Sequence, residues 1–157
     1  MKSSVYVETT IPSYLTAWRS SELVMAANQE ATRLWWETAR PGYEIFISDI
    51  VVQEASGGDP TAAGHRVAAL DGLPELAVSK EAELLAAQLL AGAALPEKAK
   101  ADALHIAVAT VHGMDYLLTW NCKHIANAAM RVKIESICRA AGYEPPVICT
   151  PLELMEE

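Results

Sequence analysis

Short apolar runs alternate with longer amphipathic segments along the whole chain. Five runs rich in Val, Ile, Leu and Tyr predict strands, at 4–7, 43–47, 76–78, 116–119 and 147–149. The segments between them predict helices over 22–39, 49–55, 60–70, 80–91, 96–112 and 123–141. Five strands separated by one or two helices each predict a three-layer α/β domain around a mostly parallel sheet.

Capping and breaking residues define the expected ends of these helices. They are Ser20 or Ser21, Asp59-Pro60, Ser79, Pro96-Glu97, Gly113 and Gly142. In the first long helix we expect an apolar stripe of Leu23, Ala27, Leu34 and Trp35 to face the core. The adjacent residues Trp35 and Trp36 cannot both face one core, so one of them is expected at an interface.

The chain has 157 residues, which fits one domain spanning 1–157. Hydrophobic residues make up 52% and charged residues 20%, so global disorder is excluded. No apolar run of about 18 residues predicts a membrane span. The N-terminus is too polar for a secretory signal, and we expect three reduced, mostly buried cysteines. A cytoplasmic protein with no membrane contact is therefore expected.

Charge is uneven along the chain. The formal net charge is −8, which argues against broad electrostatic binding of nucleic acid. Residues 119–143, however, carry four Lys and Arg against one Glu, a local charge of +3. This basic strip is interpreted either as a guide for a phosphate backbone or as a solvated helix face.

Four polar residues fall where a parallel sheet binds ligands, beyond the carboxyl ends of its strands. Glu8 follows the first strand, Glu54 follows the second after a short helix, and Asn121 follows the fourth. Asp102 lies in the first turns of the largely apolar helix that leads to the fourth strand. Taken singly, each has an ordinary interpretation as a surface residue, a helix N-terminal acid or a turn former.

Taken together, the three acids predict a cation site. If Glu8, Glu54 and Asp102 meet, each like pair at ~4 Å costs about 4 kcal/mol at an effective dielectric constant of 20. Such a cluster must bind a cation or hold protons. Because the ligands are oxygens, a hard ion such as Mg²⁺ or Mn²⁺ is the expected occupant.

Three segments have distinctive sequences. They are YVETTIPSYL, ISDIVVQEAS and KADALHIAVATVHGMDYLLTWNCKHIAN. With the order of elements, which spans nearly the whole chain, they resemble PIN-domain proteins of the VapC-like toxin group. That resemblance implies a five-stranded parallel sheet of order 3-2-1-4-5 flanked by helices. It also implies metal-dependent ribonuclease activity, with acids gathered at the carboxyl end of the sheet.

The resemblance assigns catalytic positions one by one. The first-strand aspartate of the family corresponds to Glu8, its second and third acids to Glu54 and Asp102, and its fourth acid to Asn121. Glu8, Glu54 and Asp102 are thereby the expected metal ligands. Glu8 keeps the charge with one more methylene. Asn121 removes a charge, which weakens any second metal position.

Neighbouring residues have supporting interpretations. Thr9 and Thr119 are candidates for holding water or a phosphate oxygen, and Lys123 and His124 are candidate phosphate contacts. His105 lies three residues after Asp102 and is interpreted first as a hydrogen-bonded core histidine.

The expected activity is hydrolysis of single-stranded or loop RNA, leaving 5′-phosphate and 3′-hydroxyl ends. By resemblance, an antitoxin protein covers the acidic groove and the chain forms a homodimer. Two alternatives stay open. One is a catalytically weakened module that binds RNA or protein, favoured by Asn121. The other is a small-molecule enzyme on a similar scaffold, for which the sequence offers no glycine-rich phosphate loop, GxSxG, HExxH or CxxC motif.

Overall fold

Five short strands form one sheet in the computed structural model, which describes residues 1–92 and 94–155. The strands are β1 (Ser3–Val7), β2 (Tyr43–Ser48), β3 (Glu75–Leu76), β4 (Tyr116–Leu118) and β5 (Val147–Cys149). The α-helices are α1 (Thr10–Thr16), α2 (Leu23–Leu34), α3 (Asp49–Ala55), α4 (Pro60–Ala69), α5 (Lys80–Ala91), α6 (Lys100–Val111) and α7 (Ala128–Ala140). A π-helical turn (Trp35–Ala39) and a 3₁₀ turn (Arg40–Gly42) extend α2 toward β2.

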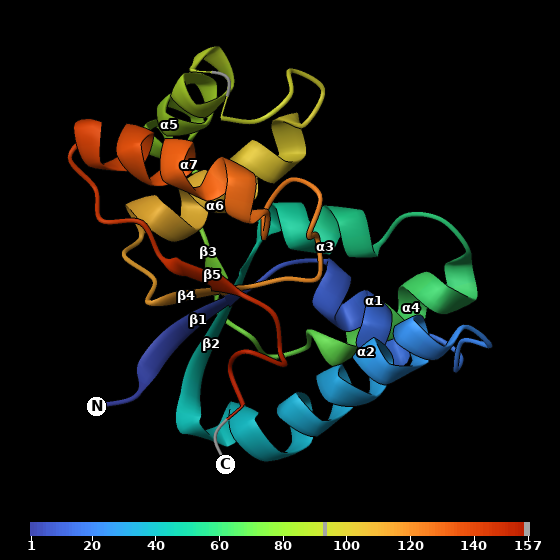
Figure 1. Cartoon of the computed structure of the whole chain (residues 1–157). Helices are drawn as coiled ribbons and strands as arrows, with labels where there is room; N and C mark the ends of the chain where they lie inside the picture. Colours follow the sequence, from blue (N-terminus) through green and yellow to red (C-terminus); the bar gives the residue numbers. More distant parts are fainter. Residues whose placement is uncertain (93, 156–157) are drawn as a thin grey trace.

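The sheet is parallel throughout, in the order β3-β2-β1-β4-β5, which confirms the predicted fold class and strand order. Helices α5, α6 and α7 cover one face of the sheet, and α1 and α2 lie on the other side (Figure 1). β1 is central, pairing with β2 on one side and β4 on the other. The carboxyl ends of β1, β2 and β4 therefore meet at one edge, where polar side chains can converge.

Helix α6 supplies much of the core. Its residues 105–110 are all buried, because its sequence is apolar on nearly every face. Asp102 lies in the first turn of this helix, before the buried stretch, as the sequence predicts. The helix thus delivers a carboxylate to the edge of the sheet while its remaining turns anchor it in the core.

Several expected helix boundaries are confirmed and others are wrong. Helices 49–55 and 80–91 have the predicted limits, and the Asp59 and Ser79 side chains accept the expected capping hydrogen bonds. α6 starts at Lys100 instead of residue 96, because Pro96 begins a turn closed by the Ala99 amide. α7 starts at Ala128 instead of residue 123, because Asn127 is its N-cap.

The predicted apolar stripe of the first long helix is wrong. Leu23, Ala27 and Leu34 are exposed, whereas Trp35 is buried. The buried face instead contains Thr32, whose hydroxyl donates to the Asn28 carbonyl oxygen and accepts from the indole N–H of Trp120. A threonine that makes both hydrogen bonds can be buried at little cost, so a tertiary contact overrides the apolar pattern.

The tryptophans and cysteines divide between core and surface. Trp35 is buried and Trp36 only partly, its ring lying 4.4 Å from the Arg40 guanidinium carbon. Trp18 is 93% exposed, whereas Trp120 is buried. Among the cysteines, Cys138 and Cys149 are buried and Cys122 is exposed, and none forms a disulfide.

None of the helices within 1–92 and 94–155 is long and apolar enough to cross a bilayer.

Candidate active site

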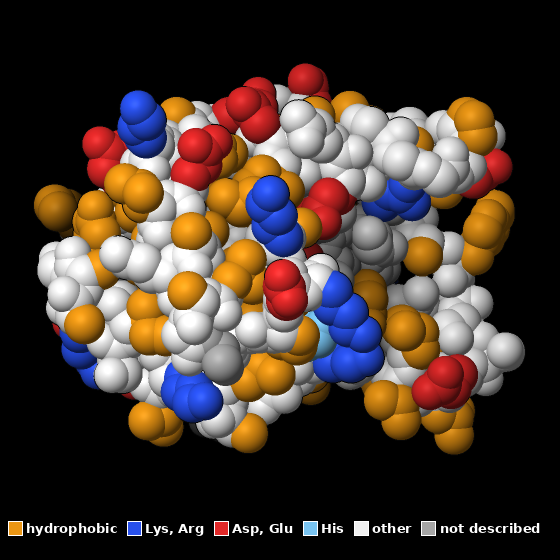
Figure 2. Space-filling model, turned by 90° about the horizontal axis from the view of Figure 1, so that it is seen from above, with side chains coloured by type: hydrophobic (Ala, Val, Ile, Leu, Met, Phe, Trp, Pro, Cys, Tyr) orange, Lys and Arg blue, Asp and Glu red, His pale blue; other side chains and the backbone are white. Residues whose placement is uncertain are grey.

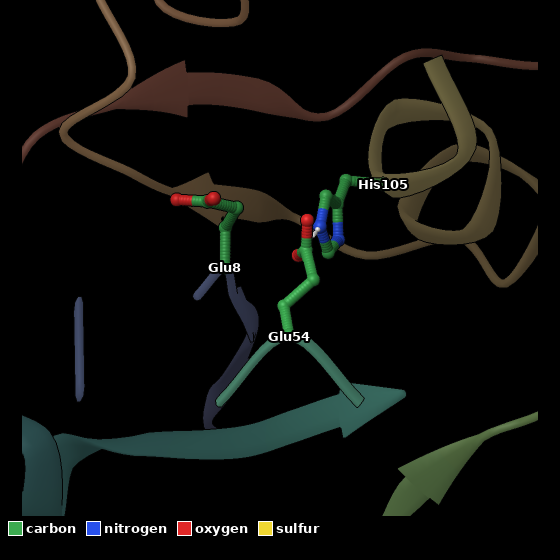
Figure 3. A group of neighbouring side chains, drawn as sticks. All are labelled: Glu8, Glu54 and His105. Atoms are coloured by element: carbon green, nitrogen blue, oxygen red, sulfur yellow. Dashed lines mark hydrogen bonds and ion pairs between the residues drawn. The ribbon is translucent and has the colours of Figure 1, made fainter. Parts of the chain in front are cut away.

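Two glutamates and a histidine from three separate elements meet at the carboxyl edge of the sheet. Glu8 directly follows β1, Glu54 lies in α3 after β2, and His105 lies on α6 (Figure 3). One ligand atom from each of the three lies within 4.8 Å of the others. In the described part of the chain this is the one group of three or more His, Cys, Asp or Glu residues so arranged. We call it the Glu8–Glu54–His105 group.

The Glu8 carboxylate is held by one of its two oxygens. Oε1 accepts from the Thr10 amide at 3.0 Å, from the Thr10 hydroxyl, and from the Thr119 hydroxyl at 2.7 Å. Glu8 is 4% exposed, so these donors compensate for burial of its charge. Oε2 accepts no hydrogen bond from the described residues.

The Glu54 carboxylate is held in the same way. Its Oε1 accepts from the Thr9 hydroxyl at 2.6 Å and contacts His105 Nε2 at 2.6 Å. Burial disfavours the charged form of Glu54, but the hydrogen bond and the electrostatic attraction from His105, together with the hydrogen bond from Thr9, outweigh that penalty and lower the pKa of Glu54. Oε2 again has no protein partner among residues 1–92 and 94–155. Thr9, predicted to bind water or phosphate, thus contacts a carboxylate in this structure.

Asp102 lies in a second cluster, formed with Asn121 and His124. Its Oδ1 accepts from Asn121 Nδ2 at 3.1 Å, and its Oδ2 lies 2.9 Å from His124 Nδ1. Asn121 Oδ1 in turn accepts from the His124 amide at 3.1 Å. We call these three residues the Asp102–Asn121–His124 cluster. Both oxygens of Asp102 therefore have protein partners, whereas Oε2 of Glu8 and Oε2 of Glu54 have none among the described residues.

Thr119 connects the two sets of residues. Its hydroxyl donates to Glu8 Oε1 and accepts from the Asn121 amide at 2.9 Å. Because Thr119 is completely buried at the end of β4, it fixes the relative positions of Glu8 and Asn121. Asp102 thus lies close to the predicted metal site through this link, but outside the Glu8–Glu54–His105 group.

The remaining predicted site residues lie beside the second cluster. His124 is mostly buried, and its Nε2 has no protein partner in the described chain. The Lys123 side chain is exposed and makes no ion pair with a described residue. Both side chains are free to contact a phosphate, as the sequence predicts, and no contact in the structure tests that role.

His105 is buried and hydrogen-bonded, as its interpretation as a core histidine requires. It also contacts Glu54, a contact that the sequence analysis missed. Its Nδ1 is hydrogen-bonded to the Tyr6 hydroxyl, which is hydrogen-bonded in turn to the Ser48 hydroxyl. Tyr6 and Ser48 are buried and were not among the predicted site residues. The available clue was the spacing of three residues between Asp102 and His105, which directs both side chains toward similar faces of α6.

Two of the four basic residues in the strip 119–143 make contacts within the described chain. Arg139 pairs with Glu135 and Glu144, and Arg131 donates to the Ile148 carbonyl oxygen. On the face seen from above in Figure 2, acidic and basic side chains are interspersed and form no large patch of one sign. A phosphate-containing ligand would therefore be held by a few local contacts near Lys123 and His124.

Thr119→Val is expected to lower the free energy of unfolding by about 1–3 kcal/mol, because it leaves the partly buried Asn121 amide without its acceptor and Glu8 with one donor fewer. Thr119→Ser keeps the hydroxyl and is the matched control. Urea denaturation of the metal-free proteins measures the difference. Equal stability of the two variants would show that the hydroxyl does not connect the clusters.

Comparisons of the chain with models of protein families, with curated proteins and with solved structures find no match. The chemistry and geometry of the two carboxylates and the residues around them therefore carry the functional interpretation.

Proposed function

We propose that the chain is a divalent-metal-dependent ribonuclease that hydrolyses phosphodiester bonds. One observation carries the proposal: Glu8 and Glu54 come from different elements, approach within 4.8 Å, and each keeps one carboxylate oxygen without a partner among the described residues. Two ionised carboxylates so close repel each other, and a cation between them relieves the repulsion.

The available donors suit a hard cation. The two oxygens without protein partners are carboxylate oxygens, the ligand type that Mg²⁺ and Mn²⁺ prefer. Glu8 and Glu54 would hold the ion, and water would complete its coordination. When bound, such an ion neutralises charge on phosphate oxygens and makes water more acidic.

The protein residues around this centre suit phosphodiester hydrolysis. In the reaction the oxygen of water forms a bond to phosphorus, the bond from phosphorus to the ribose 3′-oxygen breaks, and that oxygen takes up the proton that the water loses. His124 Nε2 and the Lys123 ammonium would contact the phosphate. Asp102 and Asn121 would orient the His124 ring through the contacts that they make with it. This assignment gives Asp102 a different role from the metal ligand that the sequence predicts.

The proposal that the substrate is RNA rests on the resemblance to VapC-like PIN-domain proteins. The proposal of 5′-phosphate and 3′-hydroxyl products rests on the same resemblance. The net charge of −8 predicts weak background affinity, which favours exposed loop RNA whose bases can be splayed out. On the same resemblance we propose an antitoxin protein as a partner and a homodimer as the assembly.

Incubation of the purified protein with structured RNA tests the activity. We expect cleavage with Mg²⁺ or Mn²⁺, no cleavage with EDTA, and recovery when Mn²⁺ is added in excess. Glu54→Gln is the matched control, because the amide keeps the shape of the side chain and removes its charge. Equal cleavage by this variant would assign the activity to a contaminant. Binding of RNA and metal without cleavage would favour the alternative of a binding module.

A further inference from the structure

A chain of buried polar groups runs from the core to Glu54. Ser48 Oγ lies 2.7 Å from Tyr6 Oη, Tyr6 Oη lies 2.7 Å from His105 Nδ1, and His105 Nε2 lies 2.6 Å from Glu54 Oε1. Ser48, Tyr6 and His105 are each completely buried, and they come from the end of β2, from β1 and from α6. This series of hydrogen bonds thus joins the two strands and the helix that border the Glu8–Glu54–His105 group.

The number of protons determines which group donates in each of these hydrogen bonds. The three contacts need one proton each. The Ser48 hydroxyl, the Tyr6 hydroxyl and one N–H of a neutral His105 supply three, and ionised Glu54 is the final acceptor. Burial raises the pKa of Tyr6 above its usual value, so its hydroxyl keeps the proton. With His105 protonated at Nε2, each donor faces an acceptor.

The other states of His105 leave a group unsatisfied. With the proton on Nδ1 instead, the Nε2 lone pair would face the Glu54 carboxylate at 2.6 Å. An imidazolium would donate to Tyr6, Tyr6 would donate to Ser48, and the Ser48 hydroxyl proton would have no acceptor among the described residues. A buried donor without an acceptor is costly. The neutral tautomer protonated at Nε2 is the state that fits every contact.

We propose that His105, held by Tyr6 and Ser48, is a positioning residue that fixes the orientation of the Glu54 carboxylate for metal binding. The inference rests on the proposed function insofar as Glu54 binds the ion. It also gives His105 a definite role within the Glu8–Glu54–His105 group: its Nε2 carries a proton and is not a metal ligand. The ion would then be held by Oε2 of Glu8 and Oε2 of Glu54, which accept no hydrogen bond from the described residues.

Glu54 needs such a constraint because its side chain is 37% exposed on the short helix α3. A glutamate there can rotate toward solvent at the cost of few contacts. The hydrogen bond from a completely buried ring holds Oε1 (Figure 3), and Oε2 has no protein partner among the described residues. Groups that orient metal ligands in this way typically contribute 10–100-fold to metal affinity.

Tyr6→Phe tests the inference, because it removes one hydroxyl and keeps the ring. We expect Mn²⁺ affinity, measured by calorimetry, to fall about tenfold or more, and ¹⁵N NMR of the wild type to show His105 protonated at Nε2 only. Tyr116→Phe on the neighbouring strand β4 is the matched control and should bind Mn²⁺ like the wild type. Ser48→Ala, which removes the first donor, should weaken Mn²⁺ binding in the same direction.

Unchanged Mn²⁺ affinity in folded Tyr6→Phe and Ser48→Ala would overturn the inference. A His105 ring protonated at Nδ1, or at both nitrogens, would overturn it as well. Neither readout requires RNA cleavage. A protein that shows the expected NMR spectrum and affinity changes, but cuts no RNA, would contradict the nuclease proposal and support the positioning role.

Discussion

Glu8→Gln is expected to abolish Mn²⁺ binding and to lower RNA cleavage by more than about 100-fold, because it removes a charged metal ligand and not merely a group that orients one. The fold should be retained. The amide oxygen can still accept from the Thr10 amide and hydroxyl and from Thr119. These hydrogen bonds weaken without the charge, but repulsion from Glu54 is also removed, about 3.5 kcal/mol at a separation of 4.8 Å and an effective dielectric constant of 20.

Thermal unfolding with and without Mn²⁺ measures this effect independently of RNA. An ion that binds only the folded protein stabilises it by about 2.7 kcal/mol at 100 times its dissociation constant. We therefore expect Mn²⁺ to raise the Tm of the wild type and to leave the Tm of Glu8→Gln unchanged. Glu44→Gln, an exposed position on β2, is the matched control and should respond like the wild type. A Tm of Glu8→Gln that rises with Mn²⁺ as in the wild type would show that the ion binds elsewhere.

The strands and their order could be predicted because they depend on local patterns. Each strand is a short β-prone run, and the helices between them require parallel crossovers. The positions of Glu8 and Glu54 follow from that topology, since both come just beyond strands that pair side by side. Prediction failed in two places. The local cap of Asn127, which accepts from the Ala129 amide, begins α7 later than expected. A tertiary contact, the hydrogen bond from Trp120, allows Thr32 to replace an apolar residue in the buried face of α2.

The partners of each carboxylate could not be predicted in the same way. Tyr6 and His105 are 99 residues apart in the sequence and meet only through packing of α6 on the sheet. Likewise, no periodicity indicates that His124 lies against Asp102, because residues 123–126 form turns where a helix was expected. Strand topology brings the acids to one edge of the sheet. The hydrogen bonds made there decide which carboxylate oxygens remain available to an ion.

Asp102→Asn is expected to separate metal binding from catalysis. In the structure Asp102 accepts from Asn121 and contacts the His124 ring, and it lies outside the Glu8–Glu54–His105 group. An asparagine would place an amide N–H₂ against one of these two partners and disturb the orientation of His124. Because small misplacements of a substrate-contacting group can cost about 100-fold in rate, we expect cleavage to fall by about that factor. Mn²⁺ affinity should change by less than about threefold, since both ligand glutamates keep their contacts.

Calorimetry with Mn²⁺ and an RNA cleavage assay on the same preparation distinguish the two roles of Asp102. Asp115→Asn is the matched control: Asp115 precedes β4, at the opposite end of that strand from Asn121, and its Oδ2 accepts from the amide and hydroxyl of Ser4. This control should cleave RNA and bind Mn²⁺ like the wild type. If Asp102→Asn instead loses Mn²⁺ affinity as completely as Glu8→Gln, Asp102 is a metal ligand, as the sequence predicts. The hydrogen bonds from Asn121 and His124 would then orient that ligand and would not position His124 against the phosphate.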